Sequence, residues 1–220
     1  SFVRGLVELS NTALKQRVNI KLDVALDALR SSARTSAATN PQVLLARGRV
    51  EREVGSPDSA VAAFARYLQG DGPRPIGELE LARTRLWLGD RAAAAGYYTA
   101  AASDDSAVVA IIRNDLFPIV ADTLLADYDS RRGIYRAAWL RQFWGSRDDL
   151  SMGSAGDRLA EHYRRWFYAR RNFALVTVSR HYDIAERYKS GSKDFDDRGI
   201  IYVRHGEPSA RVSFSGSGQR

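Results

Sequence analysis

The sequence predicts a mainly α-helical fold in which an array of helical hairpins is followed by a helical segment that ends in a short β element. Two observations indicate the helices: apolar residues recur at helical spacing along most of the chain, and one stretch repeats at a fixed interval. A third observation indicates the β element, because residues 200–203 form a β-branched and aromatic run between two turn-forming stretches.

The composition is that of a folded, basic protein. Its 220 residues suffice for one large domain or two small ones, and its hydrophobic content of 45% excludes wholesale disorder. No apolar run reaches the roughly 20 residues that a membrane-spanning helix needs. The absence of cysteine excludes disulfides, thiolate metal sites and cysteine nucleophiles. The net charge of +7, much of it from arginine, favours an acidic partner such as a protein surface, anionic lipid or nucleic acid.

The first predicted element covers residues 12–37, whose apolar residues follow a broadly helical pattern. It is either one long helix or a degenerate repeat that caps the array behind it. The chain begins at Ser1 rather than Met, so we expect its N-terminus to be processed or incomplete.

Residues 41–102 contain an internal repeat. Four positions of the first unit have counterparts of similar size 34 residues later: Gly48 and Ala82, Gly55 and Gly89, Ala60 and Ala94, Phe64 and Tyr98. In each unit, a small residue lets two helices approach closely, and a glycine suited to a left-handed C-cap ends the first helix. The alanine and the aromatic residue then pack the second helix onto the first. Pro57 stands where a second helix can begin, and residues 70–77 form a Gly/Pro-rich linker between the units.

The period, order and residue sizes of these units resemble those of tetratricopeptide repeats. The resemblance implies stacked helical hairpins with a concave surface suited to a protein partner, and we assign residues 1–103 to this region. The alternative is a pair of unrelated antiparallel helical hairpins, which leaves the predicted fold class unchanged.

The second half of the chain is also predicted to be helical. Residues 107–125 are apolar and are interrupted by Pro118, which separates two helices. Residues 132–144 form another helix, residues 145–156 form a polar loop, and residues 157–175 form a helix rich in arginine and aromatic residues.

The last of these helices has two interpretations. Its apolar, mostly aromatic residues share one broad face: Leu159, Tyr163, Trp166, Phe167 and Phe173. Aromatic residues interleaved with arginines can stack nucleic-acid bases, and a helix on a membrane surface is a weaker alternative. We favour an amphipathic core helix, because the aromatic residues fall on the face that a core would use. Its arginines are then expected to pair with carboxylates of Asp148, Asp149, Asp157 or Glu161.

Residues 196–208 contain the short string Arg204-His205-Gly206-Glu207. This string resembles the strand-end signature of histidine phosphatases, which implies a phosphorylated His205 and neighbouring arginines that hold the phosphoryl group. In that family the signature opens an α/β domain, whereas here it stands near the end of the sequence. We therefore keep a histidine phosphatase only as an alternative.

Three segments of the second half, taken in order, resemble the GWxTD domain, a bacterial family: residues 143–148, 158–165 and 196–208. The resemblance covers about residues 105–213, although the namesake motif, at residues 193–197, keeps only its final Asp. It implies that residues 104–220 form a helical region with a C-terminal strand. Further strands normally follow that strand, so we expect a truncated domain. Members are often joined to tetratricopeptide-like repeats, are commonly exported or envelope-associated, and have no established catalytic residues.

A set of residues in the third segment is predicted to shape the turns at either end of the strand: Asp197, Arg198, Gly199, Gly206, Glu207 and Pro208. Gly206 supplies a special backbone angle and Pro208 rigidifies the exit. Glu207 is expected to pair with Arg198 or Arg204.

Motifs with established chemistry are absent, among them His-Glu-x-x-His, the P-loop, Gly-x-Ser-x-Gly and a Gly-x-Gly-x-x-Gly that opens a helix. The aspartate doublets at 104–105, 148–149 and 196–197 are interpreted as N-caps or turns rather than paired catalytic carboxylates. We therefore predict no catalytic residue, no cofactor and no metal.

These features together predict a noncatalytic scaffold, a subunit of a larger bacterial complex at the envelope. We expect it in the periplasm, peripheral to the membrane rather than spanning it. Its partner is expected to be a protein, with peripheral contact to an anionic membrane surface. Nucleic-acid binding is an alternative, and no small-molecule substrate is expected. Five arginines are predicted to contact the partner: Arg47, Arg83, Arg164, Arg165 and Arg171.

Overall fold

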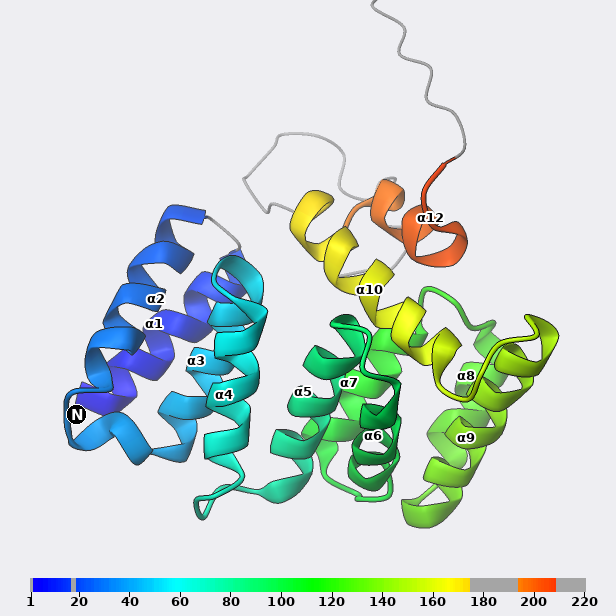
Figure 1. The fold of residues 1–220 in the computed structure, drawn as a ribbon, viewed down its shortest axis with the longest axis horizontal. Helices are drawn as coiled ribbons and strands as arrows, with labels where there is room; N and C mark the ends of the chain where they lie inside the picture. Colours follow the sequence, from blue (N-terminus) through cyan, green and yellow to red (C-terminus); the bar gives the residue numbers. More distant parts are fainter. Residues whose placement is uncertain (1, 17–18, 175–193, 209–220) are drawn as a thin grey trace, which may run out of the picture.

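The computed structural model describes residues 2–16, 19–174 and 194–208, and these form a helical array (Figure 1). The elements are α1 (Phe2–Gln16), α2 (Asn19–Ser32), η1 (Ser36–Thr39), α3 (Pro41–Val54), α4 (Pro57–Tyr67), α5 (Arg74–Trp87), η2 (Arg91–Ala93), α6 (Ala94–Ala101), α7 (Ser106–Leu116), α8 (Asp122–Ser130), α9 (Gly133–Leu150), α10 (Asp157–Asn172) and α12 (Asp197–His205). The predicted mainly α-helical class is confirmed. The predicted β element is not found within these ranges, where the only β pairing is an isolated bridge between Ala174 and Phe195.

The first predicted element is a pair of helices rather than one long helix. Residues 12–37 are divided among α1, α2 and η1, and both long helices pack against α3. Their contact is apolar, with Leu6, Ala13 and Leu29 in one cluster with Val43 of α3. The structure therefore excludes one long helix, and it has a pair of helices at the end of the array, where the other alternative put a degenerate repeat.

The two repeat units form the helical hairpins α3–α4 and α5–α6, as predicted. Gly48 of α3 is buried against α4, and a Cβ atom there would lie only 2.4 Å from the ring of Phe64. The helices can approach this closely only because Gly48 has no side chain. Pro57 is in the first turn of α4, where its missing N–H costs no hydrogen bond.

The two glycines that end the first helix of each repeat unit are required for different physical reasons. Gly89 has a φ of +89°, the left-handed conformation that its predicted role requires. Gly55 has a φ of −101°, so the prediction of a left-handed C-cap is wrong for this residue. A Cβ atom at Gly55 would lie 2.1 Å from Oε2 of Glu51. That carboxylate forms a two-point contact with Arg30 of α2, at 2.9 and 2.8 Å, so Gly55 makes room for an ion pair whose carboxylate is buried.

The predicted linker between the repeat units is shorter than expected. α5 begins at Arg74, inside residues 70–77, and Pro75 lies in its first turn. Ile76 and Gly77 are buried, and a Cβ atom at Gly77 would lie 2.4 Å from the Tyr67 ring. Gly77 therefore allows close helix packing rather than chain flexibility.

The four helices predicted between residues 107 and 175 are found, but two differ in length, and α10 ends at Asn172 rather than at residue 175. α7 and α8 lie on either side of Pro118. α9 runs through Leu150 and so includes the first part of residues 145–156, which were predicted as a loop. α10 runs across the other helices and contacts α5, η2, α9 and α12 (Figure 1).

One apolar core extends from Leu44 on α3 to Val203 on α12. It includes residues of both predicted regions, 1–103 and 104–220, while a second apolar cluster lies among α1, α2 and α3. None of the helices in the described ranges is long and apolar enough to cross a membrane.

The segment predicted as a strand is helix α12. Asp196 caps it, because its side chain accepts hydrogen bonds from the backbone N–H groups of Arg198 and Gly199. Ile200 and Val203, three positions apart, are buried, and α12 packs on α10. The β-branched residues therefore follow the helical period, and this cap and the contact with α10 outweigh their β propensity.

The residues predicted to shape turns around that strand lie at the two ends of α12. Asp197, Arg198 and Gly199 form its first turn. Gly206 follows its last residue with a φ of +82°, so the special backbone angle predicted for it is confirmed. Exposed Glu207 and Pro208 come next. Arg198 pairs with Asp196 at 2.7 Å, and Nε of Arg204 donates to the carbonyl of Pro118.

The contact between Gly48 and Phe64 can be tested with a pair of glycine substitutions. Gly48→Ala should lower the free energy of unfolding by about 1–3 kcal/mol, because its methyl group overlaps a buried ring. Gly145→Ala, in α9, has no atom within 4 Å of the new Cβ and should raise it by about 0.5–1 kcal/mol. Urea denaturation of both variants measures the difference. If Gly48→Ala stabilised the protein as much as Gly145→Ala, the close packing of α3 on α4 would be wrong.

Candidate functional site

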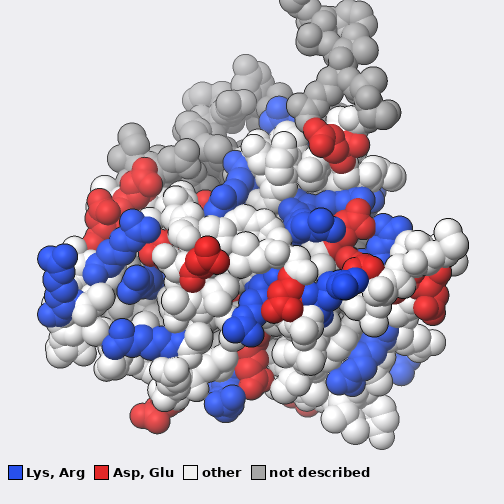
Figure 2. All heavy atoms as spheres, viewed as in Figure 1, with Lys and Arg blue, Asp and Glu red and all other residues white. Residues whose placement is uncertain are grey.

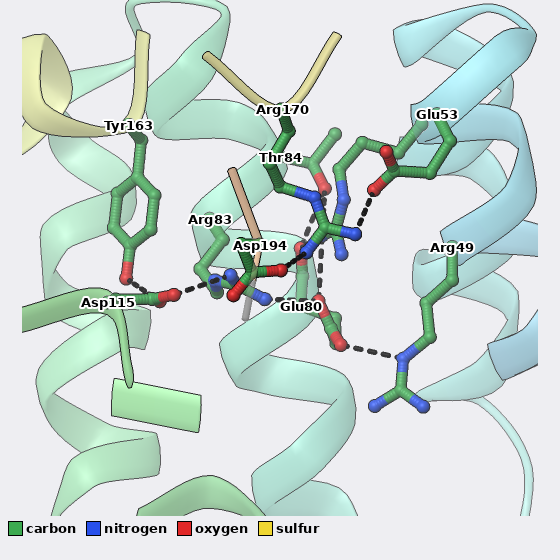
Figure 3. Close-up of polar contacts among 10 residues, drawn as sticks. Arg49, Glu53, Glu80, Arg83, Thr84, Asp115, Tyr163, Arg170 and Asp194 are labelled. Carbon is green, nitrogen blue, oxygen red and sulfur yellow. Dashed lines mark hydrogen bonds and ion pairs between the residues drawn. The ribbon is translucent and has the colours of Figure 1, made fainter. Parts of the chain in front are cut away.

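The inner faces of α3 and α5 are joined by ion pairs to one carboxylate (Figure 3). Glu80 of α5 accepts from Nε of Arg49 at 2.7 Å and from Nη1 of Arg52 at 2.7 Å, both on α3. Arg83 of α5 donates to the same carboxylate at 3.0 Å. Thr84 supports the arrangement by accepting from Arg52 at 3.2 Å while donating to the backbone carbonyl of Glu80 at 2.7 Å.

The same ion-pair network continues to α7 and α10. Arg83 also donates to Asp115 of α7 at 2.9 Å, and the hydroxyl of Tyr163 on α10 donates to the other oxygen of Asp115 at 2.9 Å. Arg170 of α10 pairs with Glu53 of α3 and with Asp194, at 2.9 Å each. Arg170, Glu53 and Asp194 form a second set of ion pairs beside the first. We call the two sets together the ion-pair network, which contains equal numbers of guanidinium and carboxylate groups: Arg49, Arg52, Arg83 and Arg170 with Glu53, Glu80, Asp115 and Asp194.

Burial and pairing act on the carboxylates of this network in opposite directions. Burial alone would raise the pKa of Glu80, but the positive charges of Arg52, Arg49 and Arg83 outweigh it and hold that pKa well below its usual value. For Asp115, burial is the larger effect and raises its pKa to about 6, although Arg83 and Tyr163 oppose the shift. At neutral pH both groups are therefore charged partners of the buried arginines.

A sequence signal for this network exists in the repeat. Arg49 and Arg83 are 34 residues apart, so they occupy equivalent positions of the two units. Each pairs with a carboxylate roughly one repeat further along: Glu80 is 31 residues after Arg49, and Asp115 is 32 after Arg83. Arg83 was predicted to contact a partner, but it is buried and bonded within the chain, so that prediction is wrong for this residue.

A hollow of about 550 Å³ lies beside the network, between α1, α3, α5, α7 and α10. Its lining includes Arg49, Glu53, Glu80, Arg170 and Asp194, all of which have ion-pair partners within the chain. The inner face of the repeats, predicted to receive a protein partner, is thus covered in part by α10.

A second cavity, of about 570 Å³, lies between α9, α10, α12 and the α7–α8 turn, and we name it the arginine pocket. It is lined by Pro118, Ile119, Val120, Ala121, Trp144, Arg147, Leu150, Arg158, Glu161, His162, Arg165, Val203, Arg204 and His205. Apolar side chains and four guanidinium groups therefore line the same cavity.

The guanidinium groups of the arginine pocket are unequally neutralised. Glu161 accepts from Arg158 at 2.7 Å and also from Arg165, so one carboxylate serves two arginines. Arg147 packs on the Phe143 ring, 3.6 Å from its centroid, and burial lowers the pKa of its guanidinium. Among the ion pairs of the described residues, none includes Arg147 or Arg204.

His162 lies at the base of this pocket with 5% of its surface exposed. Burial, followed by the positive charges of Arg83 and Arg165, lowers the pKa of His162 to about 3, so its ring is neutral at pH 7. The carbonyl of Asp115 opposes part of that shift. The Nε2 atom of His162 makes no hydrogen bond of normal geometry to the described part of the chain.

The other arginines predicted to contact a partner do not share one surface. Arg47 is half-buried on α3, with Nε 3.7 Å from Glu51. Arg164 is exposed on α10, and Arg165 lines the arginine pocket. Arg171 donates to the backbone carbonyl of Arg52 at 2.8 Å and lies 4.6 Å from the centroid of the Trp87 ring.

The aromatic residues of α10 belong to the core, as the favoured interpretation predicted. Leu159, Tyr163, Trp166 and Phe167 are buried, and Phe173 packs against them. The face that would have stacked nucleic-acid bases is therefore not accessible.

The predicted cap role is confirmed for one residue in each of two aspartate doublets, whereas Asp148 and Asp149 lie in the last turn of α9. Asp105 caps α7 and Asp196 caps α12. Asp104 accepts from the N–H of Gly133, and Asp148 accepts from those of Gly156 and Arg158. No group of three or more metal-ligating side chains occurs in the part of the chain that the structure describes.

His205 does not have the setting that a histidine phosphatase signature requires. It is the last residue of helix α12 rather than the end of a strand, and it is exposed at the edge of the arginine pocket. His181 lies outside the described residues.

No family model, curated protein or solved structure matches this chain. The resemblances to tetratricopeptide repeats and to the GWxTD domain stay predictions.

The ion-pair network predicts a large difference between two glutamates of α5. Glu80→Gln should lower the free energy of unfolding by about 3–5 kcal/mol, because it leaves buried guanidinium groups without their shared carboxylate. Glu78→Gln should cost less than about 1 kcal/mol, because its partner Arg74 is well exposed. Chemical denaturation measures both, and equal effects would mean that the network is not buried as described.

The neutral His162 predicts a pH dependence of stability. The unfolded chain takes up a proton at the ordinary histidine pKa of 6.5, whereas the folded chain does so only at about 3. The folded state therefore loses stability as pH falls below about 6.5. Between pH 7 and 5.5 the native protein should lose about 1 kcal/mol more than His162→Phe, which retains a ring but cannot titrate. Equal losses in urea titrations at the two pH values would show that His162 is accessible to protons in the folded state.

Proposed function

We propose that this protein is a noncatalytic interaction module that binds a protein partner within a larger assembly. Stacked helical hairpins offer an extended and rigid surface for such a role. The inner face of the repeats is partly covered by α10, so we place the partner on the outer surface of the array.

The observation that carries this proposal is the outward face of α9. Ile134 and Tyr135, at its start, are each 69% exposed. The last helices of a repeat array need a polar outer face to stay soluble alone, and exposed large apolar side chains mark protein contacts. The apolar start of α9 therefore favours a partner that covers it.

Charge suggests the chemistry at the edge of that contact. Arg131 and Arg132 immediately precede α9 and are exposed, and Arg141 lies on the same helix over the Tyr98 ring, 5.1 Å from its centroid. On the face drawn in Figure 2, Lys and Arg side chains are spread over the surface with carboxylates among them. A partner with an apolar centre and an acidic edge would complement this surface.

The cellular setting is part of the same proposal. The resemblance of the second half to the GWxTD domain supports a place at the bacterial envelope, and the net charge of +7 supports peripheral contact with anionic lipid. We propose that the protein is a periplasmic or envelope-associated subunit.

A double substitution on α9 tests the partner surface. Ile134→Ser with Tyr135→Ser should leave folding intact, because both side chains are exposed, and should reduce the yield of a stoichiometric co-purifying protein at least tenfold. Val24→Ser, which removes an exposed apolar side chain on α2, is the matched control and should retain the partner. Affinity purification followed by quantitative mass spectrometry provides the measurement. Full retention by the double variant would contradict the assignment of this surface.

A further inference from the structure

The arginine pocket carries more positive charge than the described residues neutralise there. Its lining contains four guanidinium groups and, as ionised carboxylate, only Glu161. His162 is neutral at pH 7 and does not change this balance. Like charges gathered around one cavity repel each other, so a bound anion would lower the energy of the folded protein.

The arginines have hydrogen-bonding capacity left for such an anion. Arg204 uses Nε for the carbonyl of Pro118, and Arg165 uses one terminal nitrogen for the carbonyl of Arg204 at 3.1 Å and the other for Glu161. Arg147 uses Nη1 for the carbonyl of Phe143 at 3.2 Å. A guanidinium group has five N–H donors, so these contacts leave donors on both Arg147 and Arg204.

The apolar part of the arginine pocket's lining suits an apolar body. It consists of Pro118, Ile119, Val120, Ala121, Leu150 and Val203. Leu150 is highly exposed and therefore open to a ligand. The cavity volume of about 570 Å³ falls in the range of small-molecule sites, about 300–1,000 Å³.

His162 adds a polar group at the base. Its ring is held by neighbouring aromatic rings, with the Trp144 ring centroid at 5.1 Å and that of Trp166 at 5.8 Å. The ring is neutral at pH 7 and therefore adds no charge to the lining.

We propose that the arginine pocket binds a small organic anion, a carboxylate or phosphate ester. Its charged group meets Arg147 and Arg204, and its apolar body lies against the apolar lining formed by residues 118–121, Leu150 and Val203. This ligand site is separate from the partner surface on α9, so each can be tested without the other.

Four probes separate the parts of this recognition. 4-Phenylbutyrate and phenyl phosphate each combine an anion with an apolar body. 4-Phenylbutanol lacks the charge, and inorganic phosphate lacks the body. We expect at least one organic anion to bind at least ten times more tightly than 4-phenylbutanol and than inorganic phosphate, with an affinity that falls as salt rises. The better of the two organic anions identifies the ligand as carboxylate or phosphate ester.

Binding can be followed through Trp144, whose indole N–H signal in NMR spectra is assigned by its loss in Trp144→Phe. Arg147→Gln should weaken the better organic anion at least tenfold. Arg204→Gln, at an exposed residue, should do the same and guards against misfolding of the first variant. Arg141→Gln, on α9 but outside the pocket lining, is the matched control and should bind within twofold of the native protein. The proposal is overturned if neither organic anion shifts the Trp144 signal, if both arginine variants bind normally, or if inorganic phosphate binds as tightly as the organic anions.

Discussion

The need to neutralise largely buried arginines connects the parts of this protein. A guanidinium group keeps its proton, so an arginine taken out of water must have a carboxylate within reach. Arg49 and Arg52 of α3 pair with Glu80 on α5. Arg83 of α5 pairs with Asp115 on α7. Arg170 closes the set from α10, between α3 and Asp194. Most of these ion pairs join two helices, so moving one helix of the array would separate buried charges from their partners.

This constraint directs function to the outside of the array. A concave face whose charges are already paired offers a partner little to bind without first breaking ion pairs. Two surfaces that no other described residue covers or neutralises lie elsewhere: the exposed apolar start of α9, and the positive arginine pocket between α9, α10 and α12. The two proposals for this protein concern those surfaces, and both treat the ion-pair network as the rigid support that holds them.

Most of the helices could be predicted from sequence, because both the periodicity of apolar residues and the glycines and prolines that end helices are local features. The hairpins around Gly48 and Pro57 and the break at Pro118 are examples. The errors arose where distant contacts decide the structure. Residues 200–203 have the composition of a strand, but they form a helix that packs on α10. Gly55 is needed to make room for the ion pair between Glu51 and Arg30 of α2, not for a left-handed C-cap. The arginine pocket is lined by residues from four segments that lie between positions 118 and 205 of the sequence. Local residue spacing does not reveal that these segments meet.

Native-state hydrogen exchange tests most directly whether the array and α10 are one cooperative unit that covers the inner face. The account predicts that slowly exchanging amides of α10 open with the same free energy, and the same dependence on denaturant, as those of α5. It would be contradicted if α10 opened at a free energy lower than that of α5 by about 2 kcal/mol or more. In that case the helix would leave the inner face readily, and the repeats would present an accessible groove.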